Sequence, residues 1–464
     1  MTANAVNSKA VNGKEKPLSL FHLSWPIFLE IFLFMIMGTI DTMMLSDISD
    51  NAVSGVGAAN QFMHIAILIL EVIGNGAAIV VAQFLGSKLF YEASRITALA
   101  VTLNTIIGLI LSVAFIFFGE HLLIILNLQG EVLVHAQKYL AIVGGGIFLQ
   151  AIINSLSAIV RVHGFTKQAM FVALGMNIIH IIANYALIYG NWGMPKLGVA
   201  GAAISTVGSR VLAMIVFFWI LYRIVHTKIE WKFYISLSKE YVTKILKIGL
   251  PSAFEQVMYQ GCQIVFLFYV TFLGEASLAA RQYANNISMF IFLFAMAVGM
   301  GTSIMVGRYV GARKPDLAYK QVFKSTRYAF IGTCIMLVFV VIFREKLVSI
   351  FTDNPEVIEL GANVLLFGII LETGRSINII CVNALRASGN ASFPLYVGFF
   401  TMILLSLSLG YLFVFHLNLG LVGVWLAIAA DEWARAFIML IRWKSRKWEK
   451  HALVSKEETT TVAH

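Results

Sequence analysis

The sequence predicts an all-α membrane protein with about twelve transmembrane helices in two parallel repeats of six. Three observations lead to this fold class. Of the 464 residues, 59% are apolar and 12% are charged, a composition that would make the chain aggregate in water. About twelve apolar windows of roughly 20 residues follow one another along the chain. Residues of the first half also recur in the second half at a fixed offset.

The repeat begins with Pro26 and Glu30, which recur as Pro251 and Glu255 about 225 positions later. Further pairs at the same offset are Asn60 with Asn285, Gly74 with Gly299, Gly76 with Gly301, Gly86 with Gly311, Arg161 with Arg386, and Gly164 with Gly389. Chance does not keep this register over so long a stretch. Because six spans return the chain to the side from which it started, the two halves are parallel repeats, a construction typical of secondary transporters.

The domain organisation follows from the spans and the loop charges. Short loops rich in Lys and Arg stay in the cytoplasm, and here such loops alternate with less basic ones. We therefore expect a multi-pass protein of the cell (plasma) membrane with both termini in the cytoplasm. The expected parts are a cytoplasmic N-terminal tail at 1–17, an N-terminal six-helix lobe at 18–222, a basic cytoplasmic linker at 223–247, a C-terminal six-helix lobe at 248–443, and a cytoplasmic C-terminal tail at 444–464.

Several functions are disfavoured by the sequence. The net charge of +10 is spread over loops and does not indicate a nucleic-acid surface. Cys262, Cys334 and Cys381 lie in apolar windows and predict no disulfide or metal site. There is no phosphate-binding loop or nucleophile elbow. Asp47 and Asp50 lack the matching acids that a membrane-embedded prenyl transferase requires, so we expect no enzyme and no cofactor.

The first lobe contains an acid that the repeat does not preserve. Asp41 lies in span 1, and the residue at the matching position of the second lobe is Phe266. In span 5, Asn177, His180 and Asn184 follow at i, i+3 and i+7, so they share one helical face, and Asn184 is expected at the depth of Asp41. A carboxylate facing amides can hold Na⁺ or a proton. We predict a cation-coupling site here; structural hydrogen bonding of Asp41, and packing of His180, are the alternatives.

The second lobe offers a second candidate cation or substrate site. Its residues are Glu255, Tyr259, Asn286, Glu372 and Asn378. The alternatives are structural, because Arg375 lies one turn after Glu372 and because Glu255 repeats Glu30.

Two further features concern packing and bending. Arg210 is expected to pair with Glu71, and Arg435 with Glu432. Pro26 and Pro251 lie inside the first span of each lobe, where proline permits a helix to bend, so each is a candidate gate; relief near a helix start is the simpler interpretation.

Taken over positions 18–443, the chain resembles the multidrug and toxic compound extrusion (MATE) family. The resemblance rests on the prolines of spans 1 and 7, on Asp41, on the Gly-rich end of span 2 through Gly86, and on the segments 161–164, 386–389 and 251–255. It implies a V-shaped pair of six-helix bundles with a central cavity. It also implies an antiporter that exports cationic or amphipathic drugs by alternating access in exchange for H⁺ or Na⁺.

The resemblance also assigns residues and partners. Asp41, His180 and Asn184 would form the first-lobe cation site, whereas Glu255 and Glu372 match the coupling acids of another branch of the family. The coupling ion and its lobe therefore stay open, with Na⁺ as the only metal considered. The expected partners are small cationic or amphipathic substrates and membrane lipids, the expected state is a monomer, and the alternative function is a lipid or lipid-linked precursor flippase of related architecture.

Overall fold

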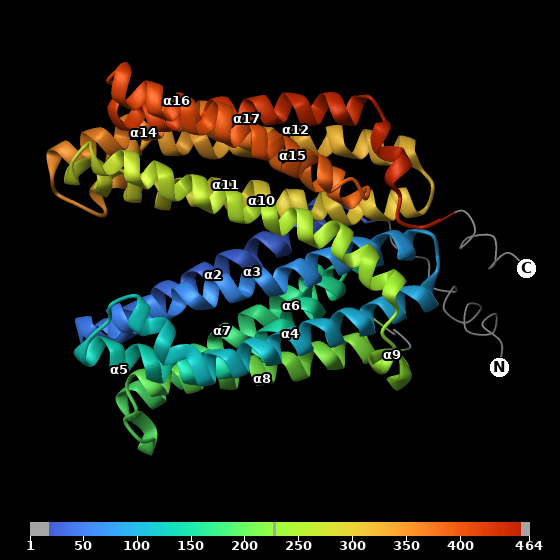
Figure 1. The fold of residues 1–464 in the computed structure, drawn as a ribbon, viewed down its shortest axis with the longest axis horizontal. Coiled ribbons are helices and arrows are strands. Elements are labelled where there is room, and N and C mark those ends of the chain that lie inside the picture. The colour runs from blue at the N-terminus through green and yellow to red at the C-terminus, as the bar shows by residue number, and fades with distance from the viewer. Residues whose placement is uncertain (1–17, 226–228, 456–464) are drawn as a thin grey trace, which may run out of the picture. The chain divides into compact units, whose positions relative to one another are not determined.

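The computed structural model describes residues 18–225 and 229–455, and within these residues every regular element is a helix (Figure 1). Contacts divide the chain into two compact units. Unit 1 contains Leu29–Gly249, and unit 2 contains Leu18–Phe28 together with the chain from Leu250 onward. The expected tail at 1–17 and the end of the expected tail at 444–464 lie outside the described residues.

The first half of the chain forms six spans and a short linker helix. The elements are α2 (Leu20–Ser46), α3 (Asp50–Gly86), α4 (Phe90–Ile125), α5 (Gly130–Tyr139) with η1 (Leu140–Gly144), α6 (Ile147–Val162), α7 (Thr166–Tyr189), η2 (Asn191–Gly193), α8 (Val199–Arg223) and α9 (Trp231–Ile235). The stretch Gly130–Gly144 and α6 meet at an angle of 47° and make one broken span.

The second half follows the same plan. Its elements are α10 (Lys239–Thr271), α11 (Glu275–Gly311), α12 (Pro315–Ile342), α13 (Arg344–Ser349), α14 (Pro355–Ala387), α15 (Ser392–Thr401), η3 (Met402–Leu407), α16 (Ser408–Tyr411), η4 (Leu412–His416), α17 (Gly420–Lys444) and η5 (Lys447–His451). The stretch from α15 to η4 is one span, Ser392–His416.

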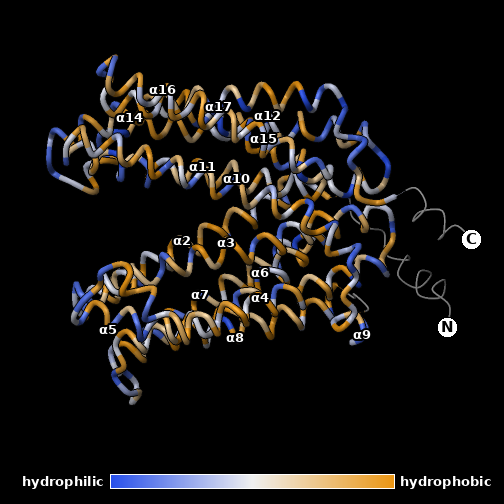
Figure 2. The backbone as a smooth tube through the Cα atoms, viewed as in Figure 1, coloured by the Kyte–Doolittle hydropathy of each residue, from blue (hydrophilic) through white to orange (hydrophobic). Residues whose placement is uncertain are grey.

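The predicted layout of twelve helices in two repeats is confirmed. In the described ranges, nine helices are long and apolar enough to cross a membrane, and the broken span makes a tenth. Apolar residues run along the helices and hydrophilic ones gather at their ends (Figure 2). The remaining two spans are α10 and α17, which are interrupted by polar side chains: Glu255, Gln256, Gln260 and Gln263 in α10, and Asp431, Glu432 and Arg435 in α17. The protein is thus a multi-pass membrane protein.

Two repeated glycines explain why the units divide as they do. A Cβ atom on Gly76 of α3 would collide with the carbonyl of Ile245, at the start of α10. A Cβ atom on Gly301 of α11 would lie 2.6 Å from Oγ of Ser24, at the start of α2. Small residues permit this close helix packing in lipid. The first turns of α10 therefore pack in unit 1, and the first turns of α2 pack in unit 2.

The two expected gate prolines lie beside these boundaries. Pro26 is inside α2, two residues before Phe28, where that helix leaves unit 2. Pro251 is inside α10, directly after Leu250, where that helix enters unit 2. Both helices continue through their proline.

The segment after α17 folds back onto unit 2 within the described residues. The ring of Trp448 stacks on that of Trp443 at 4.1 Å between ring centroids, and both are buried. Gly389, with φ of +97°, packs against the backbone carbonyl of His451, an approach that leaves no room for a side chain.

Candidate functional site

The first candidate site lies inside unit 1, where α2, α7 and α8 bring their polar side chains together. Nδ2 of Asn184 donates a hydrogen bond of 2.7 Å to Oδ1 of Asp41. Nδ1 of His180 lies 3.6 Å from the same carboxylate oxygen, and Nε2 of His180 lies 3.1 Å from Oγ1 of Thr206. His180 and Asn184 are fully buried, whereas the Asp41 side chain is 22% exposed. Two of the three expected residues of α7, His180 and Asn184, thus face Asp41, whereas no described contact joins Asn177 to it.

The hydrogen bonds of Thr206 favour one tautomer of His180. The Thr206 hydroxyl donates to the carbonyl of Ala202 at 2.9 Å, so its oxygen is left to accept from Nε2 of His180. Assigned from this network, the neutral imidazole carries its proton on Nε2. Its unprotonated Nδ1 therefore faces Asp41, and two acceptors oppose each other.

Several buried polar atoms of α7 lack a hydrogen-bond partner. Within the described residues, Nδ1 of His180, Oδ1 of Asn184 and both amide atoms of Asn177 are buried without a hydrogen-bond partner. A buried acceptor without a donor is costly, and such groups gather at sites built for a ligand or an ion. One proton or one cation bound between these acceptors would satisfy them.

A small pocket opens beside the acid. It is lined by Gly38, Asp41, Thr42, Leu45, Val56, Asn60, Tyr139, Ala202 and Thr206. Its lining adds Asn60, Tyr139 and Thr206 to the residues that the sequence pointed to. The sequence marked Asn60 only as a repeated position, and nothing in it marks Tyr139 or Thr206, because it is the packing of α3, α5 and α8 against α2 that brings the three together.

A buried cation accompanies this site. Arg210 follows Thr206 by one turn of α8, and its Nη1 is buried with no hydrogen-bond partner among the described residues. Its charge acts on Tyr139 and on Asp41. The expected ion pair between Arg210 and Glu71 does not form, because the electrostatic partner of Glu71 is Arg161 instead. Arg210 is thus oriented toward the Asp41 site.

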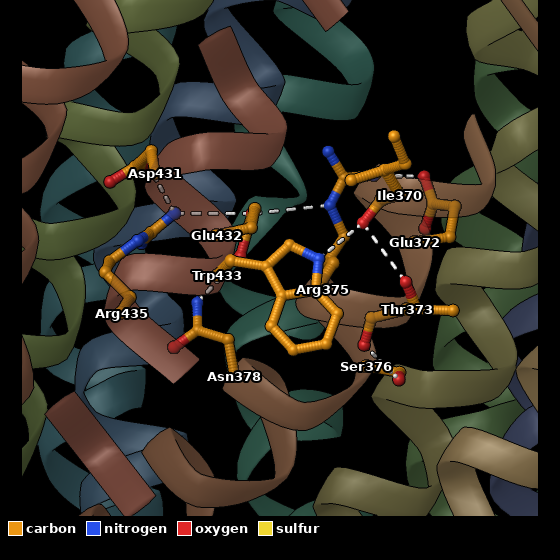
Figure 3. Close-up of polar contacts among 10 residues, drawn as sticks. All are labelled: Ile370, Glu372, Thr373, Arg375, Ser376, Asn378, Asp431, Glu432, Trp433 and Arg435. Carbon is orange, nitrogen blue, oxygen red and sulfur yellow. Dashed lines mark hydrogen bonds and ion pairs between the residues drawn. The ribbon is translucent and has the colours of Figure 1, made fainter. Parts of the chain in front are cut away.

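Unit 2 holds the second group of buried charges, drawn in Figure 3. Arg375 of α14 contacts Glu372 at 2.7 Å and Glu432 of α17 at 3.3 Å. Arg435 contacts Asp431 at 2.9 Å and Glu432 at 3.3 Å, as expected for a local pair. The five residues form a continuous ladder in which each carboxylate touches at least one guanidinium.

The other second-lobe residues lie at different distances from this ladder. Nδ2 of Asn378 donates to Glu432 at 2.8 Å, so Asn378 belongs to it. Tyr259 is close enough to interact electrostatically with Arg375 and Arg435. The Asn286 amide accepts from Gln282 at 3.3 Å in an exposed position on α11, and no described bond joins it to the ladder.

Glu255 forms its ion pair with an arginine outside the ladder, although it also interacts electrostatically with Arg435. Its carboxylate lies 2.7 Å from Nη2 of Arg386. The same pair occurs in unit 1, where Glu30 lies 2.9 Å from Arg161. Each carboxylate precedes its arginine by 131 positions, so the two ion pairs are one feature of the repeat.

Comparison with known sequences identifies the family. The MatE family model matches residues 26–186 and 251–412, which are the two repeats. The chain is 40% identical over 434 residues to "Uncharacterized transporter YisQ" of Bacillus subtilis (strain 168), covering 94% of this chain and 95% of the relative. It is 26% identical over 442 residues to "Probable multidrug resistance protein NorM" of Thermotoga maritima, covering 94% of each.

Solved structures share the fold. One, described as a crystal structure of MATE in the bent conformation, has a TM-score of 0.85 at 20% identity and covers 96% of both chains. Another, a MOP superfamily transporter from Pyrococcus furiosus, has a TM-score of 0.84 at 19% identity over the same share of both chains. With the family model matching both repeats, this chain belongs to the MATE family of membrane transporters.

Proposed function

We propose that this protein is a proton-coupled antiporter that exports cationic or amphipathic compounds by alternating access, with the coupling proton bound at Asp41. One observation carries the proposal: the carboxylate of Asp41 and Nδ1 of His180 lie 3.6 Å apart, and this Nδ1, assigned above as unprotonated, has no hydrogen-bond partner. A proton on Asp41 supplies such a partner, because the carboxylic acid can then donate to the imidazole. Binding and release of the proton would therefore remake this contact.

A proton suits the site better than Na⁺. Sodium prefers several oxygen ligands, by analogy with other hard cations, and here a single carboxylate supplies the negative charge and a ring nitrogen lies beside it. Arg210 already places a positive charge near Asp41, and a second full charge in a buried site would be repelled by it. A proton neutralises Asp41 and needs no coordination shell.

The carboxylates of unit 2 are less suited to the same task. Glu255, Glu372, Asp431 and Glu432 each touch an arginine, whereas no Lys or Arg lies within ion-pair distance of Asp41 in the described chain. A neighbouring guanidinium favours the charged form of a carboxylate. The three carboxylates of the ladder outnumber its two arginines, so this lobe is the second candidate for a bound proton.

The substrate class follows from the named relatives. NorM of Thermotoga maritima is named as a multidrug resistance protein, and this favours drug export over lipid flipping. We place the transporter in the plasma membrane as a monomer with both termini in the cytoplasm, in line with its loop charges. Its energy source would be the proton gradient, without a bound cofactor.

The test uses purified protein in vesicles loaded with a fluorescent cation, with H⁺ and Na⁺ gradients imposed separately. Parent protein should export the dye under an H⁺ gradient alone, and Asp41→Asn should abolish export while the protein remains folded. The matched control is Asp47→Asn, because Asp47 lies on the loop directly after the same helix, where it accepts from Tyr189 in an exposed position. Export by Asp41→Asn at the parent rate, or export driven only by Na⁺, would refute the proposal.

A further inference from the structure

The linker helix α9 packs against α4 within unit 1, and Figure 1 shows its place in the fold. Phe233 is buried, and its ring meets that of Tyr91 of α4 edge to face at 5.2 Å. The carbonyl of Tyr234 accepts from Oγ1 of Thr102 at 2.8 Å, and the Tyr234 hydroxyl bonds that of Tyr222 at 3.0 Å. These contacts hold α9 along α4 and against the end of α8.

The opposite face of α9 is apolar and uncovered. Trp231 and Ile235 are each 83% exposed, and Leu237, just after the helix, is 61% exposed. Trp231 and Ile235 are four residues apart, so they project from the same side. Three large apolar side chains held together in this way are unfavourable in water, and they mark a surface that something covers.

The depth of α9 indicates what covers it. Exposed aromatic residues gather at the same end of unit 1: Tyr91 at the start of α4, and Trp219 and Tyr222 near the end of α8. Tryptophan and tyrosine concentrate at the boundary between lipid and water, where their rings suit both media. With Trp231 they form a belt, so α9 lies at the level of the membrane surface.

The charges beside this face are mostly positive. Among the described residues from 223 to 239, the cations are Arg223, Lys232 and Lys239, all exposed, and the single acid is Glu230. Beyond them, Lys244 is paired with Glu240 at 2.8 Å. A short helix with an apolar face and flanking lysines is typical of segments that lie in the interface of anionic membranes.

We propose that α9 is an interfacial anchor for anionic phospholipid, in which Trp231, Ile235 and Leu237 enter the bilayer surface and Arg223, Lys232 and Lys239 bind lipid phosphate groups. The lipid is therefore an anionic one of the leaflet that faces the basic loops. The anchor depends on the fold of unit 1 and on the membrane, and it stands whether or not Asp41 couples transport to protons.

The test uses the full-length protein in vesicles of phosphatidylcholine mixed with phosphatidylglycerol, one of the two lipids being brominated so that it quenches nearby tryptophan. The chain has eight tryptophans, so the signal of Trp231 is the difference between the parent and Trp231→Phe. We expect this signal to be quenched more strongly by brominated phosphatidylglycerol than by brominated phosphatidylcholine. The preference should weaken as salt is added, because exposed charges are screened.

A pair of lysine variants separates charge binding from simple burial of the ring. In Lys232→Gln/Lys239→Gln, the preference of the site for the anionic lipid should fall roughly thirtyfold. The matched control, Lys314→Gln/Lys320→Gln, removes the same charge from exposed positions of unit 2 and should keep the preference. Equal quenching by the two lipids in the parent would overturn the proposal, as would an absence of quenching, which would indicate water or a protein on this face.

Discussion

The guanidinium of Arg161 lies 2.9 Å from the carboxylate of Glu30, and Ser157 of the same helix donates to that carboxylate at 3.0 Å. The repeat reproduces the pair as Glu255 with Arg386 at 2.7 Å. A duplicated ion pair between the first and fourth spans is best explained as architecture common to both units. Asp41 has no such twin, because the repeat places Phe266 at its position, and that ring packs in the core of unit 2.

The duplicated pair predicts matched losses of stability. Glu30→Gln and Glu255→Gln should each lower the free energy of unfolding by about 3 kcal/mol, because each breaks a partly buried ion pair. Thermal unfolding in detergent measures the loss. Glu275→Gln, at an exposed helix start, should have little effect. If Glu255→Gln kept full stability yet stopped transport, Glu255 would belong to a cation site instead.

The tautomer of His180 gives a prediction for Thr206→Val. Without the Thr206 oxygen, Nε2 loses its acceptor and the imidazole is free to carry its proton on Nδ1, where it can donate to Asp41. That bond stabilises the charged carboxylate, so proton binding should require a more acidic solution. The optimum of dye export should therefore shift to lower pH, as measured in vesicles over a pH series.

Two controls accompany this variant. Thr206→Ser keeps an oxygen at the same place and should retain the parent profile. An unchanged profile in Thr206→Val would mean that Nδ1 already carries the proton.

Arg210 should determine which ion is accepted. In Arg210→Gln the fixed positive charge near Asp41 is gone, so repulsion of Na⁺ is relieved. We expect Na⁺ to inhibit proton-driven export competitively in this variant and to have no such effect on the parent. Arg210→Lys preserves the charge and should behave like the parent. Insensitivity of Arg210→Gln to Na⁺ would show that the ligands at Asp41, and not this charge, exclude sodium.

The ladder of unit 2 predicts unequal effects for its acids. Glu432 touches both Arg375 and Arg435, and it also accepts from Asn378, whereas Glu372 touches only Arg375. Glu432→Gln should therefore lower stability by about 3 to 5 kcal/mol. Glu372→Gln leaves two carboxylates facing two guanidiniums and should cost clearly less. Thermal unfolding of the two variants side by side gives the answer, and a reversed order would argue against the ladder as a structural unit.

The sequence predicted the features that depend on helical periodicity or on the internal repeat. The offset predicted both six-span repeats, and the spacing of Asn177, His180 and Asn184 placed them on one face, two of which meet Asp41. Local sequence was not informative about rotation between helices. Glu71 and Arg210 are both charged and within spans, yet they face different neighbours. Thr206 was not predicted from the sequence, because a single threonine in a helix forms no recognisable motif. Only the packing of α8 gives it a role.

The packing of Leu18–Phe28 in unit 2, and of the first turns of α10 in unit 1, has a consequence for cutting the chain. If the polypeptide were divided in the linker and its fragments were produced apart, each would lack a segment needed to complete its own bundle. Neither fragment should insert and fold alone, whereas co-production should restore the protein. The two compact units thus do not coincide with the two repeats of the sequence, although the repeats share one fold.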